Sequence, residues 1–383
     1  MRRTVLTAIW FGLLLRLFVA IWNGFFGPSF GADLDALSFH LQAVEYAQTP
    51  MMDEFQIGWI YIYVLGFFYY LTTDSLFLGS LLSCVAWLAS AYILVKMMRL
   101  LSVDKSNQFK AMLIYAVLPS SIFFTSVTLR EPYQLLFVNL AIYAALKIYL
   151  NKSSIHWLVL FCAVIGLGVL HGALLAFGLF IVIATLILLT FRDRKGSSLV
   201  KLALVAPLVF LVALYGLWLF TSVSYNLDEG LGVAVETYQQ GGLGTDARTH
   251  YKESVEINGV AGLLLFIPAS VFQYLFEPMP WRISAAVDGV LLLENILRAW
   301  LIWKACVGLL NMPAQGRKPV LFVFISYLVV ETIWSLGTIN WGTAMRHHLP
   351  SIGLLVTAAF VYSSQKTGLQ VKSRAIKSVA VRQ

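Results

Sequence analysis

Two acidic residues and a histidine stand close together near the start of the chain. Asp33 and Asp35 open a stretch with apolar residues at helical spacing, and His40 falls two turns after Asp33 on the same face. A carboxylate in such a position can act as a general base that removes a proton from a hydroxyl group. The two acids can instead serve only the helix, as its N-cap and a first-turn charge. Either acid is therefore a candidate catalytic base, and spacing does not choose between them.

Asp33 or Asp35 can also hold a divalent cation such as Mg²⁺ or Mn²⁺, because these ions prefer oxygen ligands. Nothing in the spacing requires a metal, and no other cofactor is implied. The three cysteines, Cys84, Cys162 and Cys306, lie within apolar runs and have neither disulfide nor metal spacing.

Further polar residues that can bind a substrate lie between the apolar runs. An arginine can fork onto a phosphate through two hydrogen bonds, and a neighbouring histidine can add another. Each of these residues also has a structural alternative, such as a local ion pair or a position in a turn. The candidate substrate-binding residues are His40, Arg130, Glu131, His171, Arg282, Asn340, Arg346 and His347.

The composition places these residues in a membrane protein. Of the 383 residues, 59% are hydrophobic and only 12% are charged, and the mean hydropathy is +0.79. Apolar runs recur along almost the whole chain, which indicates one integral, all-α domain over residues 1–364 and a basic tail over 365–383. The net charge of +8 does not indicate nucleic-acid binding, because its distribution follows membrane topology.

The distribution of basic residues predicts the topology. Most of the 27 Lys and Arg residues reach the cytoplasmic side if the apolar runs 57–73 and 259–276 lie in the outer interface and do not cross. Both termini are then cytoplasmic, and the loops 27–74, 223–283 and 338–348 face the exterior. The ten predicted spans are 4–26, 75–99, 110–127, 133–150, 155–170, 173–191, 199–222, 284–306, 318–338 and 348–364.

Arg16, Glu294, Arg298 and Glu331 fall deep inside these spans and must face protein or water. Glu294 and Arg298 are four positions apart, so we expect them to pair along one helix face. Glu331 has no partner nearby in the sequence.

Three short segments resemble a known family. They are LPSSIFFTSVTLREPYQLLF at 118–137, Met-Pro-Trp at 279–281 and NWGTAMRH at 340–347. With the acidic first outer loop, the first segment resembles the C-type (GT-C) superfold of glycosyltransferases that use polyprenyl-phosphate-linked sugars. The other two resemble segments of uncharacterised bacterial membrane proteins from polysaccharide gene clusters. The resemblance implies that Asp33 or Asp35 is the base for the acceptor. The chain departs from it at Arg130-Glu131, where many relatives have Arg-Asp, and in lacking a large outer domain.

The leading interpretation is an inverting sugar transfer at the outer face of a bacterial inner membrane. The donor would be a polyprenyl-phosphate-linked sugar, the acceptor a glycan, lipid or protein, and membrane lipid the surrounding partner. A polymerase or ligase that moves a whole lipid-linked oligosaccharide is a second interpretation. A transporter or flippase of lipid-linked sugars is a third, although the sequence has no internal repeat and its unusual polar residues gather on one face.

The topology can be tested by labelling single cysteines introduced at Lys105 and Gly316 in intact cells. We expect a membrane-impermeant maleimide to leave both unlabelled until the cells are permeabilised. External labelling of either position would contradict the ten-span arrangement.

Overall fold

The computed structural model of the chain describes residues 3–28, 33–49, 59–190, 239, 248–252 and 259–361. The regular elements within these ranges are all helices, apart from an isolated antiparallel bridge between His250 and Asn340. The all-α fold class predicted from the sequence is therefore confirmed.

Five of the described helices are long and apolar enough to cross a membrane. Their apolar spans hold 19–25 residues, or about 29–38 Å at 1.5 Å per residue, close to the ~30 Å of a bilayer core. The membrane character predicted from composition is confirmed at this level. The five helices are α1 (Arg3–Phe25), α4 (Leu76–Leu100), α7 (Glu131–Asn151), α9 (Gly172–Thr190) and α14 (Ala314–Gly337).

Other predicted spans correspond to helices that are shorter, interrupted or more polar. The span predicted at 110–127 is split into two helices, and the one predicted at 199–222 lies outside the described residues. The ten-span arrangement therefore stays a prediction. The remaining helices of this group are α5 (Lys105–Val117), α6 (Pro119–Phe124), α8 (Ile155–Leu170), α13 (Ala286–Asn311) and the C-terminal helix Ile352–Val361.

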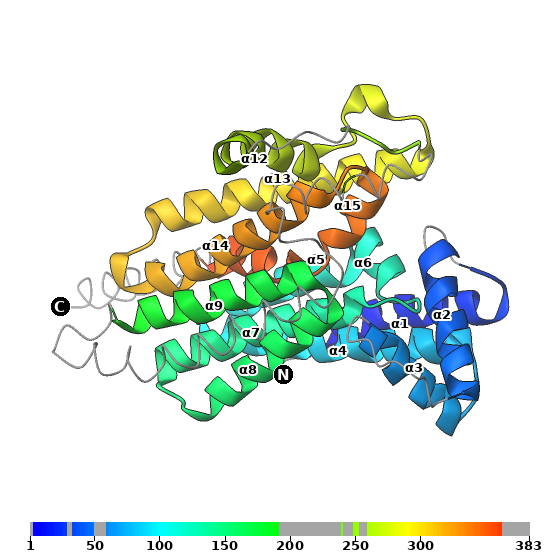
Figure 1. Cartoon of the computed structure of the whole chain (residues 1–383). Coiled ribbons are helices and arrows are strands. Elements are labelled where there is room, and N and C mark those ends of the chain that lie inside the picture. Colours follow the sequence, from blue (N-terminus) through cyan, green and yellow to red (C-terminus); the bar gives the residue numbers. More distant parts are fainter. Residues whose placement is uncertain are drawn as a thin grey trace, which may run out of the picture.

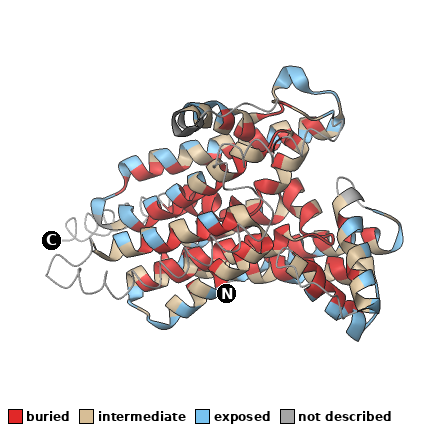
Figure 2. Ribbon diagram, in the orientation of Figure 1, coloured by how far each residue is buried: buried red, intermediate tan, exposed pale blue. Residues whose placement is uncertain are grey.

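The long helices lie side by side in one bundle (Figure 1). α1 contacts α4 and α5, α4 contacts α7, and α7 contacts α8 and α9. α14 contacts α9 on one side, and α12 (Gly259–Phe276) and α13 on the other. Buried residues follow the facing sides of these helices (Figure 2). α1 turns an exposed apolar stripe outward, including Trp10, Leu14, Phe18 and Phe25, which suits contact with lipid.

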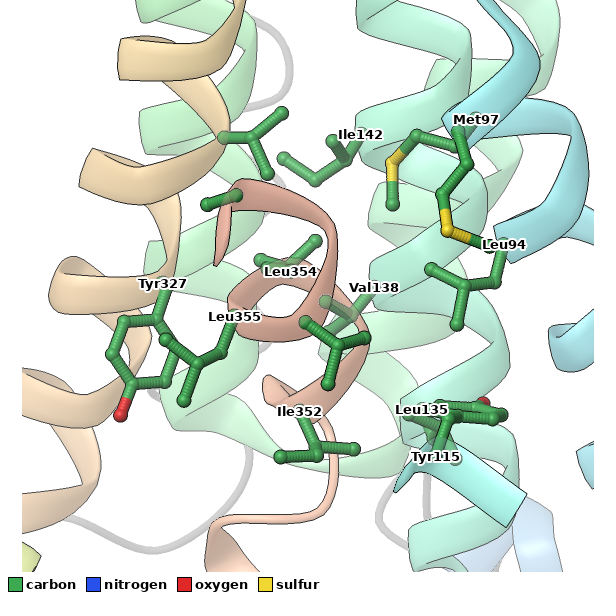
Figure 3. Close-up of a cluster of buried hydrophobic side chains, with 14 of the residues drawn as sticks. Leu94, Met97, Tyr115, Leu135, Val138, Ile142, Tyr327, Ile352, Leu354 and Leu355 are labelled. Carbon is green, nitrogen blue, oxygen red and sulfur yellow. The ribbon is translucent and has the colours of Figure 1, made fainter. Parts of the chain in front are cut away.

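The C-terminal helix Ile352–Val361 lies at the centre of the bundle. Every residue from 347 to 361 is buried, as expected for a helix that is apolar on all sides. In Figure 3, Leu354 and Leu355 lie among side chains from α4, α5, α7 and α14. A Cβ added at Gly353 would collide with the Asn139 side chain, so glycine permits close approach to α7. This helix gives the preceding residues a rigid base.

A buried arginine stabilises the interruption between α5 and α6. Pro119 cannot continue α5, so carbonyl groups of its last turn lose their helical partners. Arg16 of α1 donates to the carbonyl of Ala116 at 2.8 Å, to Ser121 Oγ at 2.8 Å and to Thr125 Oγ1 at 2.7 Å. Its guanidinium carbon also lies 3.7 Å from the centroid of a Trp87 ring.

The C-terminal end of α12 is capped by three buried side chains. Arg298 donates to the carbonyl of Leu275, at 3.4 Å, and Asn295 to that of Glu277, at 2.8 Å. His348 donates its Nε2 proton to the carbonyl of Tyr274, at 3.2 Å. These groups replace the missing donors of the last helical turn. They fix the direction in which the chain leaves α12.

The expected pairing of Glu294 with Arg298 is not formed. Glu294 Oε1 instead accepts the backbone N–H of Ser120 at 2.7 Å, which caps the N-terminus of α6. Arg298 is engaged with α12 and with Asn295 Oδ1. Each of the two side chains therefore hydrogen-bonds to a backbone group or an amide near it and not to the other. Their spacing on one helix face did not predict these partners.

Glu331 has partners that lie far from it in sequence. Its Oε2 lies 2.6 Å from His348 Nδ1, and its Oε1 accepts from Ser351. Because His348 Nε2 already donates to a carbonyl, one proton is shared between Nδ1 and the carboxyl group. This pair holds α14 to the start of the C-terminal helix.

The two predicted interfacial runs are helical. α3 (Ile60–Leu71) has 12 residues, about 18 Å, which is too short to cross a bilayer core. It packs against α2 (Asp33–Gln48), and both lie at one end of the bundle, where α2 stands across the long helices (Figure 1). α12 corresponds to the second run.

Replacing Arg16 tests whether the α5–α6 interruption depends on it. Arg16→Leu leaves buried oxygen acceptors without a donor, and each costs about 1–3 kcal/mol. We expect a clear fall in the thermal unfolding temperature of the purified protein, measured by tryptophan fluorescence. Arg99→Leu, at an exposed position of α4, is the control and should have little effect. Equal temperatures for both variants would contradict this account.

Candidate functional site

Three segments that are distant in sequence place charged side chains at one end of the bundle. They are α2, the first turn of α7, and the short helix α15 (Trp341–His347), which leads into the C-terminal helix. α2, α6 and α15 lie at this end (Figure 1). Ala36 of α2 packs with Phe124, Leu129 and Leu349 in one apolar cluster. This packing brings the polar face of α2 against α15.

The centre of the site is Arg346 between two carboxylates. Its Nη1 forms an ion pair with Asp35 Oδ2 and lies 4.0 Å from Glu131 Oε1. Asp35 and Arg346 were both candidates from the sequence, and so was Glu131. The structure brings all three together.

The exposure of the three side chains differs, and this decides what each can do. The Asp35 side chain is 49% exposed, that of Arg346 18% and that of Glu131 6%. An ion pair with one partner half in solvent contributes at most about 1 kcal/mol. Arg346 can therefore release Asp35 and bind a phosphate in its place. The released Asp35 carboxylate can then accept a proton from a group that arrives from solution.

α15 is held in place by its own cap and by a strap from the preceding loop. Asn340 Oδ1 accepts the N–H of Thr343 at 2.7 Å, so this residue is the N-cap. The strap, residues 248–252, pairs with the chain before α15: Tyr251 N–H donates to the carbonyl of Ile339 at 3.0 Å. Lys252 Nζ donates to the carbonyl of Ser335 at 2.6 Å.

Asp288, at the start of α13, fastens both the strap and α15. Its carboxylate accepts two hydrogen bonds from Arg248, at 2.6 and 3.1 Å, and one from Trp341 Nε1 at 3.1 Å. It also accepts the backbone N–H groups of Ser284 and Ala285. A bidentate pair of this kind fixes orientation as well as position.

Two neutral imidazole rings flank the charged centre. Thr338 Oγ1 donates to the carbonyl of Trp334 at 2.8 Å, so His347 Nδ1 must be the donor in its 2.9 Å contact with Thr338 Oγ1. His347 Nε2 then carries a lone pair. His171 Nδ1 accepts the N–H of Ala173 at 3.2 Å, so its proton lies on Nε2.

Burial and nearby cations keep both rings neutral. Burial lowers the pKa of His171 to about 3, and the charge of Arg130 adds to this. Burial also holds the pKa of His347 well below its usual value, with Arg346, His171 and Arg130 contributing. His347 stacks on Trp334 at 3.9 Å between ring centroids, and His171 meets the same ring edge-on at 4.6 Å. Neither histidine adds positive charge to the site near pH 7.

Arg130 lies at the N-cap position of α7, beside this group. Its Nη1 donates to the carbonyl of Leu170 at 3.2 Å, and its guanidinium carbon lies 5.8 Å from the centroid of the Phe39 ring. Its charge acts on both site histidines. It is a second cation at this end of the bundle.

Other predicted site residues have separate positions. His40 Nδ1 lies 2.9 Å from Tyr69 Oη and joins α2 to α3. Arg282 donates to the carbonyl of Tyr251 at 3.3 Å and lies 3.6 Å from a Glu277 oxygen. Asn340 has its structural role as a cap. Asp33 is the first residue of α2, and its side chain lies outside the described residues.

Sequence reasoning missed several residues at this end of the bundle. Tyr61, Gln134 and Trp334 sit inside apolar helices, and only Gln134, one turn after Arg130 and Glu131, had a position that could have indicated the site. Among the described residues, no three His, Cys, Asp or Glu side chains are grouped to hold a metal ion. The divalent cation stays a prediction.

The comparisons with known proteins give no match: no family model fits the chain, and neither curated proteins nor solved structures show significant similarity to it.

Arg346 can be tested as a phosphate ligand with citronellyl phosphate as the probe. Arg346→Lys keeps the charge but loses the planar fork, so we expect at least ~10-fold weaker binding in lipid nanodiscs, measured by thermophoresis. Arg282→Lys is the matched control, because Arg282 binds a carbonyl elsewhere. Unchanged affinity for Arg346→Lys would remove this residue from the site.

Proposed function

We propose that this chain is a membrane glycosyltransferase that moves a sugar from a polyprenyl-phosphate-linked donor to an acceptor hydroxyl at the outer face of a bacterial inner membrane. The observation that carries the proposal is Arg346, an arginine shared between two carboxylates at one end of a bundle of apolar helices. This combination provides a carboxylate that can act as a base, a cation that can bind phosphate, and a position that a lipid can reach.

Each step of an inverting transfer has a suitable group. Asp35, half exposed, accepts the proton of the acceptor hydroxyl. The oxygen of that hydroxyl attacks the anomeric carbon, and the bond from this carbon to the phosphate oxygen breaks. Arg346 and Arg130 stabilise the negative charge that develops on the departing phosphate. His171 and His347 are neutral, so they can hydrogen-bond to the substrate without competing with the two arginines for the phosphate.

Apolar surfaces near this end suit the prenyl chain. α3 exposes Val64, Phe67, Tyr70 and Leu71 and is too short to cross the bilayer, which is typical of a helix lying in the interface. It packs against α2, which carries Asp35. A lipid-linked phosphate can therefore reach Arg346 while its tail stays in lipid.

The buried charges weigh against a transporter. Arg16, Glu294 and Arg298 bind backbone groups at helix ends, whereas ionisable residues of a transport path face a channel or substrate. A polymerase or ligase would use the same chemistry on a larger donor. The assay below distinguishes it from a single-sugar transferase by the size of the donor that supports transfer.

Asp35→Asn tests the base. Asparagine keeps the size of the side chain but accepts no proton, so we expect at least ~100-fold slower transfer with donor binding retained. The measurement is radiolabelled sugar transfer from a panel of polyprenyl-phosphate sugars in nanodiscs. Asp74→Asn, at an exposed position after α3, is the control.

Full transfer activity in Asp35→Asn would exclude Asp35 as the base. No transfer by the wild-type protein from any donor of the panel, alongside transfer from a lipid-linked oligosaccharide, would favour the polymerase or ligase.

A further inference from the structure

Three buried side-chain oxygens near the first turn of α7 have no hydrogen-bond partner within the described part of the chain. They are Glu131 Oε2, Gln134 Oε1 and Tyr61 Oη. The residues are 5%, 1% and 8% exposed, so bulk water does not satisfy them. A buried polar atom left unpaired costs about 1–3 kcal/mol. A ligand that pairs with all three would recover this energy.

The three residues lie near one another at the first turn of α7. Glu131 and Gln134 are three positions apart on α7 and therefore share a helix face. The Tyr61 ring of α3 lies 5.6 Å from that of Tyr133, in the same turn of α7, and 5.2 Å from Phe39. The Glu131 carboxylate is near enough to act electrostatically on the Tyr61 hydroxyl. This region is adjacent to Arg346, which is 4.0 Å from the other Glu131 oxygen.

The chemistry of these atoms selects the ligand. Two of them are pure acceptors, because a carboxylate and an amide oxygen donate no proton. Burial raises the pKa of the Tyr61 hydroxyl, with Tyr133, Tyr69 and Glu131 contributing, so this hydroxyl stays protonated and can donate or accept. A phosphate would be repelled by the carboxylate, whereas a neutral molecule with several hydroxyl groups fits. The aromatic rings of Phe39 and Tyr61 offer an apolar wall for a sugar face.

We propose that Glu131, Gln134 and Tyr61 form the subsite that binds the hydroxyl groups of the donor sugar, beside the phosphate position at Arg346. This assignment rests on the proposed function and adds that separate residues bind the phosphate and the sugar of the donor. Arg346 and Arg130 take the phosphate common to all donors, and the three oxygens of the subsite choose among sugars. A site that hydrogen-bonds sugar hydroxyls discriminates strongly against analogues that lack them.

The test compares a lipid phosphate with and without a sugar. The probes are citronellyl phosphate and its glucosyl, galactosyl, mannosyl and arabinosyl derivatives, with affinities measured in nanodiscs. We expect at least one derivative to bind the wild-type protein more tightly than citronellyl phosphate. Gln134→Leu and Tyr61→Phe should each reduce that derivative's affinity by about tenfold, the value of one hydrogen bond of about 1.4 kcal/mol, and leave citronellyl phosphate unchanged.

Tyr92→Phe, at an exposed tyrosine of α4, is the matched control and should change neither affinity. Tyr61→Phe removes a single oxygen, so it serves if Gln134→Leu does not fold. Equal losses for sugar-bearing and sugar-free lipids would assign the residues to structure and overturn the subsite. The same conclusion follows if no derivative binds more tightly than citronellyl phosphate. Transfer activity in the radiolabel assay decides the proposed function separately.

Discussion

A polar backbone group inside a bilayer must find a partner within the protein, and the fold depends on how this demand is met where helices are interrupted. Arg16 supplies donors at the end of α5, and Glu294 supplies an acceptor at the start of α6. Arg298 and His348 do the same for the last carbonyls of α12. The costly buried charges thus stabilise helix ends that the apolar sequence cannot stabilise by itself.

These interruptions also direct the chain toward the candidate site. α6 and the turn after it lead to Arg130 and Glu131, and the short helix α15, before the C-terminal helix, presents Arg346. If α5 continued without a break, the first turn of α7 would lie elsewhere relative to α15. The buried polar network and the charged site are therefore two consequences of one architecture.

The site combines rigid and adaptable parts. α15 is fixed by its Asn340 cap, by the strap at 248–252 and by the buried helix that follows it. Asp35, in contrast, is half exposed on a helix at the edge of the molecule. A fixed cation beside a more accessible carboxylate suits a reaction in which the donor binds first and the acceptor arrives from outside. Glu131 is buried and lies 4.0 Å from Arg346, next to the position that a ligand of Arg346 would occupy.

Much of this protein was determined by the sequence alone. Its apolar runs predicted an all-helical membrane domain, because twenty or so apolar residues have few other stable arrangements. Polar residues in the outer segments between such runs are unusual, and this was enough to include Asp35, Glu131, Arg346, His171 and His347 among the candidates. Tyr61, inside an apolar helix, gave no comparable indication, and Gln134 was indicated only by its position one turn after Arg130 and Glu131.

Only the tertiary structure decided which of these residues act together. Asp35 and Arg346 are separated by 311 positions, and no local pattern encodes such a pair. Periodicity also suggested that Glu294 binds Arg298, whereas each of them has a different partner. The reason is physical: helical spacing determines which residues share a face, but a buried polar group takes its partner from whichever helix packs against that face, and packing is a property of the whole bundle.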